Sequence, residues 1–155
     1  MEFIDVTRIL PGLKGIVLHV ANIDANALTD LLTKHGFDVY VLDGSLMLDE
    51  RAFFEQAKDL FGFPDYFGYG WASWDDSMGD FAQLSPSKVA IIWKDADKTF
   101  ATIPHTLLQA VSDMYGIAFR VALRGRPGGG QEHLAKQWEL FILGSGPGFS
   151  ADINI

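Results

Sequence analysis

Apolar and polar positions along the chain alternate between short continuous apolar runs and helical periodicity. Gly15–Val20 is a short apolar run of strand length, and Phe37–Leu42 is predicted as a second strand that the turn signal Asp43-Gly44 ends. Between them, Asp24 is a candidate N-cap for a helix whose leucines recur at helical spacing up to Gly36. This part of the chain therefore predicts a strand, a helix and a second strand.

A second pair of helices is predicted between the second and third strands. Asp49 is a candidate N-cap for a helix in which the apolar residues share one face. The glycines of Pro64–Gly70 predict a loop, and Trp71–Phe81 returns to helical spacing. The apolar side of this helix carries Trp71, Trp74, Met78 and Phe81. We therefore expect the helix to bury its rings and to turn its acidic residues towards solvent.

The remaining elements follow the same alternation. Lys88–Trp93 is a strongly apolar strand candidate, and a helix is predicted from about Pro104 to a stop near Gly116. Ala118–Leu123 is predicted as a further strand, and Trp138–Leu143 as a strand at the edge of the sheet.

Strands separated by helices of this length imply right-handed crossover connections and a mainly parallel sheet that is covered by helices. The predicted fold class is therefore α/β. A chain of 155 residues without internal repeats is expected to form one domain. Within that domain, Gly144–Ile155 is predicted to be a loosely held tail.

Composition narrows the range of possible partners. Apolar residues make up 48% of the chain and charged residues 21%, which is the composition of a globular protein and not of a disordered one. The net charge of −8 argues against nucleic acid as a direct ligand, because phosphate binding requires clustered lysine and arginine. If charge determines the choice of partner, the partner is basic.

No segment has the features of an export signal or of a membrane span. Met1–Asp5 lacks the positive start of a signal peptide, and no apolar run approaches the roughly 18 residues that a membrane-spanning helix needs. The absence of cysteine is compatible with a reducing compartment. We therefore expect a cytoplasmic protein that does not bind membranes.

The segment Phe63–Phe81, FPDYFGYGWASWDDSMGDF, combines aromatic rings with acidic side chains. The wider range Asp59–Ser87 contains five aspartates and neither lysine nor arginine. Geometry alone favours a structural interpretation, because a solvated amphipathic helix face would also carry such acids. The loop before the helix favours a functional interpretation instead, since Tyr66, Phe67 and Tyr69 lie beside glycines. Amphipathic aromatic residues next to fixed charges suit a recognition surface.

The sequence does not contain a recognisable catalytic or metal site. Asp75 and Asp76 are consecutive and diverge on a helix, so they cannot form the facing carboxylate pair of glycoside hydrolysis. Asp76 and Asp80 lie one turn apart and could share a cation, but no nearby histidine completes a metal site. GRPGGGQE lacks the end of a phosphate-binding loop, and there is no Gly-x-Ser-x-Gly elbow. We therefore expect no enzyme activity, no bound metal and no cofactor.

The segment Phe63–Phe81 resembles the hallmark of the barstar family, the intracellular inhibitors of secreted bacterial ribonucleases. In that family a Pro-acid-Tyr-aromatic-Gly loop runs into a helix that carries aspartates, as PDYFG and WDD do here. The order of predicted elements is also similar, from the strand that ends in VLDG to the AFRVAL strand. The resemblance implies a barstar-like domain with a family core at about residues 37–125, to which residues 1–36 and 126–155 add extensions.

The resemblance also implies which residues contact a partner. In the family the loop tyrosine and glycine contact the nuclease, and these positions match Tyr66 and Gly68. One helix aspartate, which matches Asp76, fills the phosphate-binding site of the nuclease. An acidic residue on the following helix has no clear match, since Val111 falls at about the expected place and Asp113 lies nearby.

This sequence departs from the family at the start of the acidic helix, where Ala72 replaces the first inhibitory aspartate. Tyr69 and Asp75 could serve a different nuclease. The complete set of predicted partner-binding residues is Tyr66, Gly68, Tyr69, Ala72, Asp75, Asp76 and Asp80.

Two functions remain open at this point. The first is an immunity or antitoxin protein that blocks the active site of a ribonuclease, with a basic ribonuclease or another cationic protein as its partner. The second is a barstar-like interaction module that no longer inhibits a ribonuclease. Asp76 supports the first function, whereas Ala72 and the extra terminal segments support the second.

Overall fold

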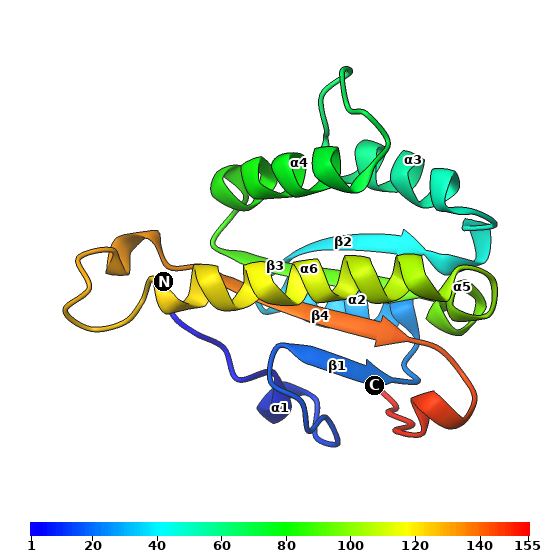
Figure 1. The fold of residues 1–155 in the computed structure, drawn as a ribbon. Helices are drawn as coiled ribbons and strands as arrows, with labels where there is room; N and C mark the ends of the chain where they lie inside the picture. The colour runs from blue at the N-terminus through cyan, green and yellow to red at the C-terminus, as the bar shows by residue number, and fades with distance from the viewer.

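The computed structural model describes all 155 residues, and its centre is a four-stranded sheet (Figure 1). The strands are β1 (Leu18–Ala21), β2 (Asp38–Asp43), β3 (Lys88–Lys94) and β4 (Gln137–Leu143). All neighbouring strands pair in parallel, in the spatial order β1-β4-β3-β2. The structure therefore confirms the α/β class and the parallel sheet.

Six helices connect or flank the strands. They are α1 (Val6–Ile9), α2 (Ala25–Lys34), α3 (Glu50–Phe61), α4 (Trp71–Leu84), α5 (Ala96–Thr102) and α6 (Pro104–Leu123). The two predicted N-caps are confirmed, because a carboxylate oxygen of Asp24 accepts from the amide of Ala27 and one of Asp49 from Ala52, both at 2.8 Å. The short helices α1 and α5 were not predicted from the sequence.

The helices cover both faces of the sheet with separate apolar clusters. On one face, α3, α4 and α6 pack against the strands in one large cluster, in which Phe53 and Trp74 of the helices meet Trp93 and Trp138 of the strands. On the other face, α1 and α2 pack against the sheet through a smaller cluster. Figure 1 shows α6 in front of the strands and α2 behind them. This arrangement explains why the strands β3 and β4 read as nearly continuous apolar runs.

The predicted strand Ala118–Leu123 is wrong, because these residues form the second half of α6. The predicted stop near Gly116 is also wrong. A glycine inside a helix costs about 1 kcal/mol relative to alanine, which burial can offset. Here the buried residues Met114, Ile117 and Val121 continue the helical spacing across the glycine. An apolar run of this length fits a strand or a buried helix, and packing against the sheet selects the helix.

The predicted edge position of Trp138–Leu143 is wrong as well. The strand β4 lies between β1 and β3, and all seven of its residues are buried. The two edge strands are β1 and β2. The helix α6 carries the chain from β3 back over the sheet, so that β4 enters beside β3 and is covered on both faces.

The N-terminal strand is shorter than predicted, and the C-terminal tail is bonded to the residue that follows this strand. The strand β1 begins at Leu18 and not at Gly15, because Val17 adopts a φ of 70° and the amide of Leu18 bonds to the carbonyl of Ile16 at 2.7 Å in a tight turn. The tail is held more firmly than predicted, since Asn22 exchanges backbone hydrogen bonds with Ala151 and Ile153 at 2.9 and 3.0 Å.

The assignment of residues 1–155 to one domain stays a prediction. It is favoured by the fact that β1 and β4, which lie outside the predicted family core, pair with each other and with β3 in one sheet. No helix is both long enough and apolar enough to cross a bilayer.

Candidate protein-interaction surface

The loop Pro64–Gly70 is anchored by buried rings and presents one tyrosine to solvent. Phe63 and Phe67 are buried with ring centroids 5.0 Å apart, and the amide of Phe67 donates to the carbonyl of Pro64 at 2.9 Å. Tyr66 lies between these anchors and is 87% exposed. A loop that is pinned on both sides of an exposed tyrosine presents that side chain at a low entropic cost.

The end of the loop is shaped around Gly68 and Tyr69. The amide of Gly68 donates to the side-chain oxygen of Ser73 at 3.1 Å, and a methyl group at position 68 would approach that oxygen to 2.7 Å. Tyr69 has a φ of 53°, a left-handed conformation that is uncommon for residues other than glycine. Its ring packs edge-on against Phe67 and is half-buried. The loop therefore has a defined shape that two of the predicted site residues determine.

Cationic side chains of α3 approach this loop. The guanidinium carbon of Arg51 lies 3.8 Å from the centroid of the Tyr69 ring, and the amine of Lys58 lies 3.5 Å from the Tyr69 hydroxyl. The first contact has the geometry of a cation–π interaction. Both contacts are made to Tyr69, and neither cation forms an ion pair with an aspartate between Asp59 and Ser87.

The inner side of α4 holds the helix against the sheet. Trp74, Ser77, Met78 and Ala82 are buried, whereas Trp71 and Phe81 are only half-buried. The predicted apolar side is therefore confirmed at its centre and is incomplete at its two ends. The indole nitrogen of Trp74 donates to a carboxylate oxygen of Asp113 at 3.1 Å, which ties α4 to α6.

The outer side of α4 carries the predicted site residues. Ala72, Asp75, Asp76 and Asp80 are all exposed. The residues at 72, 76 and 80 follow one another at a spacing of four and form one row along the helix. We call the exposed carboxylates of Asp75, Asp76 and Asp80 the acidic stripe. None of them takes part in an ion pair within the protein.

Asp113 on α6 lies beside the acidic stripe, although the sequence placed it only near the expected family position. Its carboxylate accepts a hydrogen bond from the indole of Trp74 and another, at 3.0 Å, from the side-chain amide of Gln109. Partial desolvation and the negative charges of Asp113 and Asp76 raise the pKa of Asp75, while Arg120 partly opposes this rise. Desolvation, the largest of these effects, and the neighbouring negative charges both disfavour the ionised form of Asp75. A cationic group of a partner beside Asp75 would favour the ionised form.

Lys136 fixes the far end of α4 and was missed by the sequence reasoning. Its amine donates to the carbonyls of Ala82, Gln83 and Ser85 at 2.9, 2.7 and 2.6 Å. A cation at this position satisfies carbonyls that have no partner inside the helix and complements the helix dipole. Burial and the charge of Arg124 lower the pKa of Lys136.

The variant Lys136→Met is expected to lower the free energy of unfolding by about 1–2 kcal/mol, because hydrogen bonds to a charged group are lost while the aliphatic stem stays. Chemical denaturation followed by circular dichroism measures this change. Lys34→Met is the matched control, because Lys34 is exposed and forms no ion pair. Equal effects of the two substitutions would contradict the capping role of Lys136.

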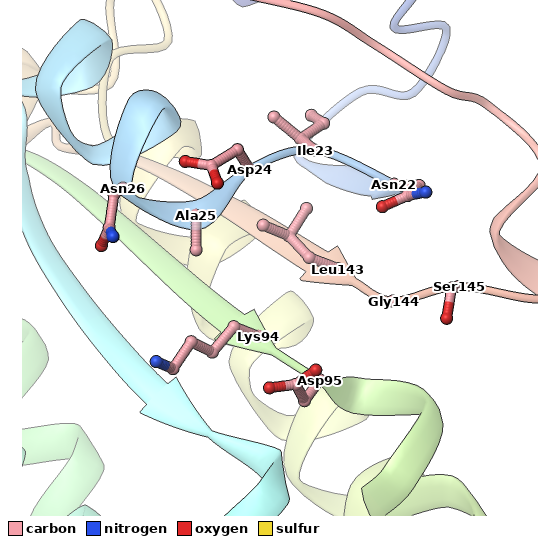
Figure 2. Close-up of a pocket in the computed structure, with 10 residues that line it drawn as sticks. All are labelled: Asn22, Ile23, Asp24, Ala25, Asn26, Lys94, Asp95, Leu143, Gly144 and Ser145. Carbon is pink, nitrogen blue, oxygen red and sulfur yellow. The ribbon is translucent and has the colours of Figure 1, made fainter.

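A separate polar cleft opens at the carboxyl ends of β1, β3 and β4 (Figure 2). Its charged side chains already have partners within the protein. Asp24 caps α2, Lys94 pairs with Asp43 at 3.7 Å, and Asp95 pairs with Lys98 at 3.6 Å. No three histidine or acidic side chains gather closely enough to hold a metal ion. We therefore assign no ligand to this cleft.

Comparison with known proteins identifies the family of this chain. The family model described as Barstar (barnase inhibitor) matches residues 37–126. No match was found among curated proteins. The matched residues include β2, β3, the loop Pro64–Gly70 and the helices α3 to α6, whereas β1 and β4 lie outside. Because the match covers more than half of the 155 residues and the fold agrees with it, the chain belongs to the barstar family.

Proposed function

We propose that this protein inhibits a ribonuclease by placing the loop Pro64–Gly70 and the acidic stripe over the active site of the enzyme. A ribonuclease that binds phosphate must present converging cationic side chains. Carboxylates on a helix can occupy that cleft, form charge-assisted hydrogen bonds and exclude RNA without breaking a bond. The family description as barnase inhibitors supports this proposal.

The observation that carries the proposal is the exposure of Asp76 and Asp80 without a cation of their own. Their carboxylates need no rearrangement of internal ion pairs before they contact a partner. The exposed Tyr66 adds an aromatic contact in the loop that leads into α4. An inhibitor of this kind would act in the cytoplasm and protect a cell that produces the nuclease.

A second candidate function is a protein-interaction module that does not inhibit ribonucleases. It is favoured by Ala72, which is exposed in the first turn of α4 where the family carries its first inhibitory aspartate. In this case the same surface would bind another cationic protein.

An inhibition assay distinguishes the two functions. RNA cleavage by a small, basic, barnase-type ribonuclease is measured while the protein is added up to a molar excess. Loss of activity at a one-to-one ratio is the result expected for an inhibitor. Complex formation by size exclusion with cleavage unchanged would favour the interaction module. If the protein neither inhibited cleavage nor formed a complex, the proposal would be overturned for this class of nuclease.

Binding to a cationic ribonuclease is expected to depend on salt. The association rate should fall roughly tenfold or more between low and high ionic strength, because ions screen the attraction between the acidic stripe and the cationic cleft. The dissociation rate should change less. Surface plasmon resonance at several salt concentrations measures both rates. An association rate independent of salt would show that the acidic stripe does not guide the encounter.

A further inference from the structure

The outer side of α6 carries an uncharged, largely apolar surface, which we call the α6 patch. Its members are the exposed residues Leu108, Ser112, Tyr115, Phe119, Ala122 and Leu123. They recur at helical spacing and therefore lie on one side of the helix. The four large side chains among them are between 37% and 58% exposed, and the two rings touch edge-on with their centroids 4.7 Å apart. Figure 1 shows no other element in front of α6.

The second half of α6 is apolar on two opposite sides. Ala118 and Val121 are buried against the sheet, whereas Phe119 and Leu123 point away from it. This double character also explains why Ala118–Leu123 resembled a strand in the sequence. A helix that is apolar all round is normally buried, and a contiguous exposed apolar patch marks an interaction site. The sheet covers only one of the two sides, so the other side is suited to a partner.

Two charges of opposite sign lie beside the α6 patch. Asp113 and Arg120 are the only acidic and basic residues of α6 apart from His105. Both line the groove between α4 and α6, so they lie on the same flank of the patch. Neither of them takes part in an ion pair within the protein. Asp113 comes before the middle of the patch and Arg120 after it, which makes this flank complementary to itself when the helix is reversed.

We propose that two copies of this protein associate through the α6 patch, with their α6 helices antiparallel. A twofold axis that passes beside Ile117 places residues at equal distances before and after Ile117 opposite each other. Tyr115 then meets Phe119 of the second copy, and Ser112 meets Ala122 of the second copy.

The charges favour the antiparallel arrangement over a parallel one. In an antiparallel pair the same flanks of the two helices meet, so Asp113 of each copy lies next to Arg120 of the other. A parallel pair would place like charges opposite each other, which is unfavourable.

A second copy fits the α6 patch because a twofold interface must be complementary to itself. The patch meets this condition in its rings, its small residues and its flanking charges. The acidic stripe does not, because two copies would bring carboxylates together in a protein of net charge −8. The proposal goes beyond ribonuclease inhibition and does not depend on it.

The dimer is expected to be weak and reversible. The α6 patch is about 22 Å long on a helix that is about 10 Å wide. It therefore covers less than the roughly 800 Å² per partner of a stable interface. We expect a dissociation constant of about 10–100 μM.

Sedimentation equilibrium of the full chain, over concentrations on both sides of this range, tests the proposal. The average mass should rise from 17.1 kDa towards that of a dimer. Phe119→Asp should weaken association at least about tenfold, because it places a carboxylate in the centre of the interface. Leu84→Asp is the matched control, since it adds the same charge at an exposed position of α4 outside the patch and should leave association unchanged. Circular dichroism checks that both variants are folded.

Cysteine cross-linking tests the antiparallel register. The chain has no cysteine of its own, and Ser112 and Ala122 are both exposed. A mixture of the variants Ser112→Cys and Ala122→Cys should be linked by a short thiol cross-linker faster than either variant alone. In the proposed register the two different positions face each other, whereas identical positions are about 15 Å apart along the axis.

A protein that stays monomeric at all these concentrations would overturn the proposal. Equal effects of Phe119→Asp and Leu84→Asp would also overturn it, because association would then not use the α6 patch. Cross-linking that is as fast in one variant alone as in the mixture would contradict the antiparallel register. None of these outcomes bears on the inhibition assay, which is carried out with a ribonuclease.

Discussion

Trp74→Ala is expected to lower the free energy of unfolding by about 3–5 kcal/mol, the range for removal of a large buried ring. Trp74 is fully buried and packs against the rings of Phe53, Phe63 and Trp71 at centroid distances of 5.2, 6.1 and 6.1 Å. These partners come from α3, from the residue just before the loop and from α4 itself, so a cavity here would weaken the packing that holds the acidic stripe in place. Urea denaturation should show a lower midpoint with an unchanged slope.

The variant Trp74→Phe separates packing from hydrogen bonding. It keeps an aromatic ring in the cluster but removes the N–H that donates to Asp113. We expect this variant to lose about 1 kcal/mol from the missing hydrogen bond, with an additional cost for the smaller ring. If Trp74→Ala were no more destabilising than Trp74→Phe, the aromatic cluster would not be what holds α4 in place.

The elements that the sequence predicted well are those whose local signals agree with their packing. In α2 and α3 an aspartate cap precedes a regular apolar spacing, and both helices start where the caps predicted. The strand β3 has an apolar run that is typical of a strand buried on both faces, and it is buried on both faces in the structure. In α6 the local signals conflict, because Gly116 suggests a stop and the run after it is mainly apolar. Packing of Ile117 and Val121 against the sheet resolved that conflict.

The position of β4 could not be predicted from its own residues. Strand order depends on where the crossover helices carry the chain, and a last apolar strand in the sequence is most simply added at the edge of the sheet. Glu139 is instead buried because it meets His19, a residue 120 positions away in the sequence. A contact over that separation leaves no local periodic signal.

The candidate surface could be predicted in part. Helical spacing was sufficient to expect the exposure of Asp76 and Asp80, which the structure confirms. The contacts that shape the surface come from other elements, namely Arg51 on α3, Asp113 on α6 and Lys136 before β4. These contacts depend on how α4 packs in three dimensions, so no spacing within the helix reveals them. The roles of all predicted site residues in binding stay predictions.

Asp76→Ala is expected to weaken binding to the inhibited ribonuclease by about 2–3 kcal/mol, or about 30- to 150-fold in the dissociation constant. The carboxylate of Asp76 lies in the centre of the row formed by positions 72, 76 and 80, and position 72 carries no charge. In the proposed mechanism, Asp76 would therefore contact the cationic cleft without help from position 72. The loss should appear mainly as faster dissociation, since it removes direct hydrogen bonds to the partner.

Asp59→Ala is the matched control for this prediction. Asp59 is also exposed and has no ion-pair partner, but it lies on α3 outside the predicted partner-binding set. Both substitutions remove one negative charge, so both should slow association slightly and to a similar degree. Neither should change the free energy of unfolding by more than about 0.5 kcal/mol, because neither carboxylate is bonded internally. An equal loss of affinity in the two variants would mean that net charge, and not contact between Asp76 and the enzyme, accounts for binding. The difference between the two dissociation rates therefore measures the contact that the proposed mechanism requires.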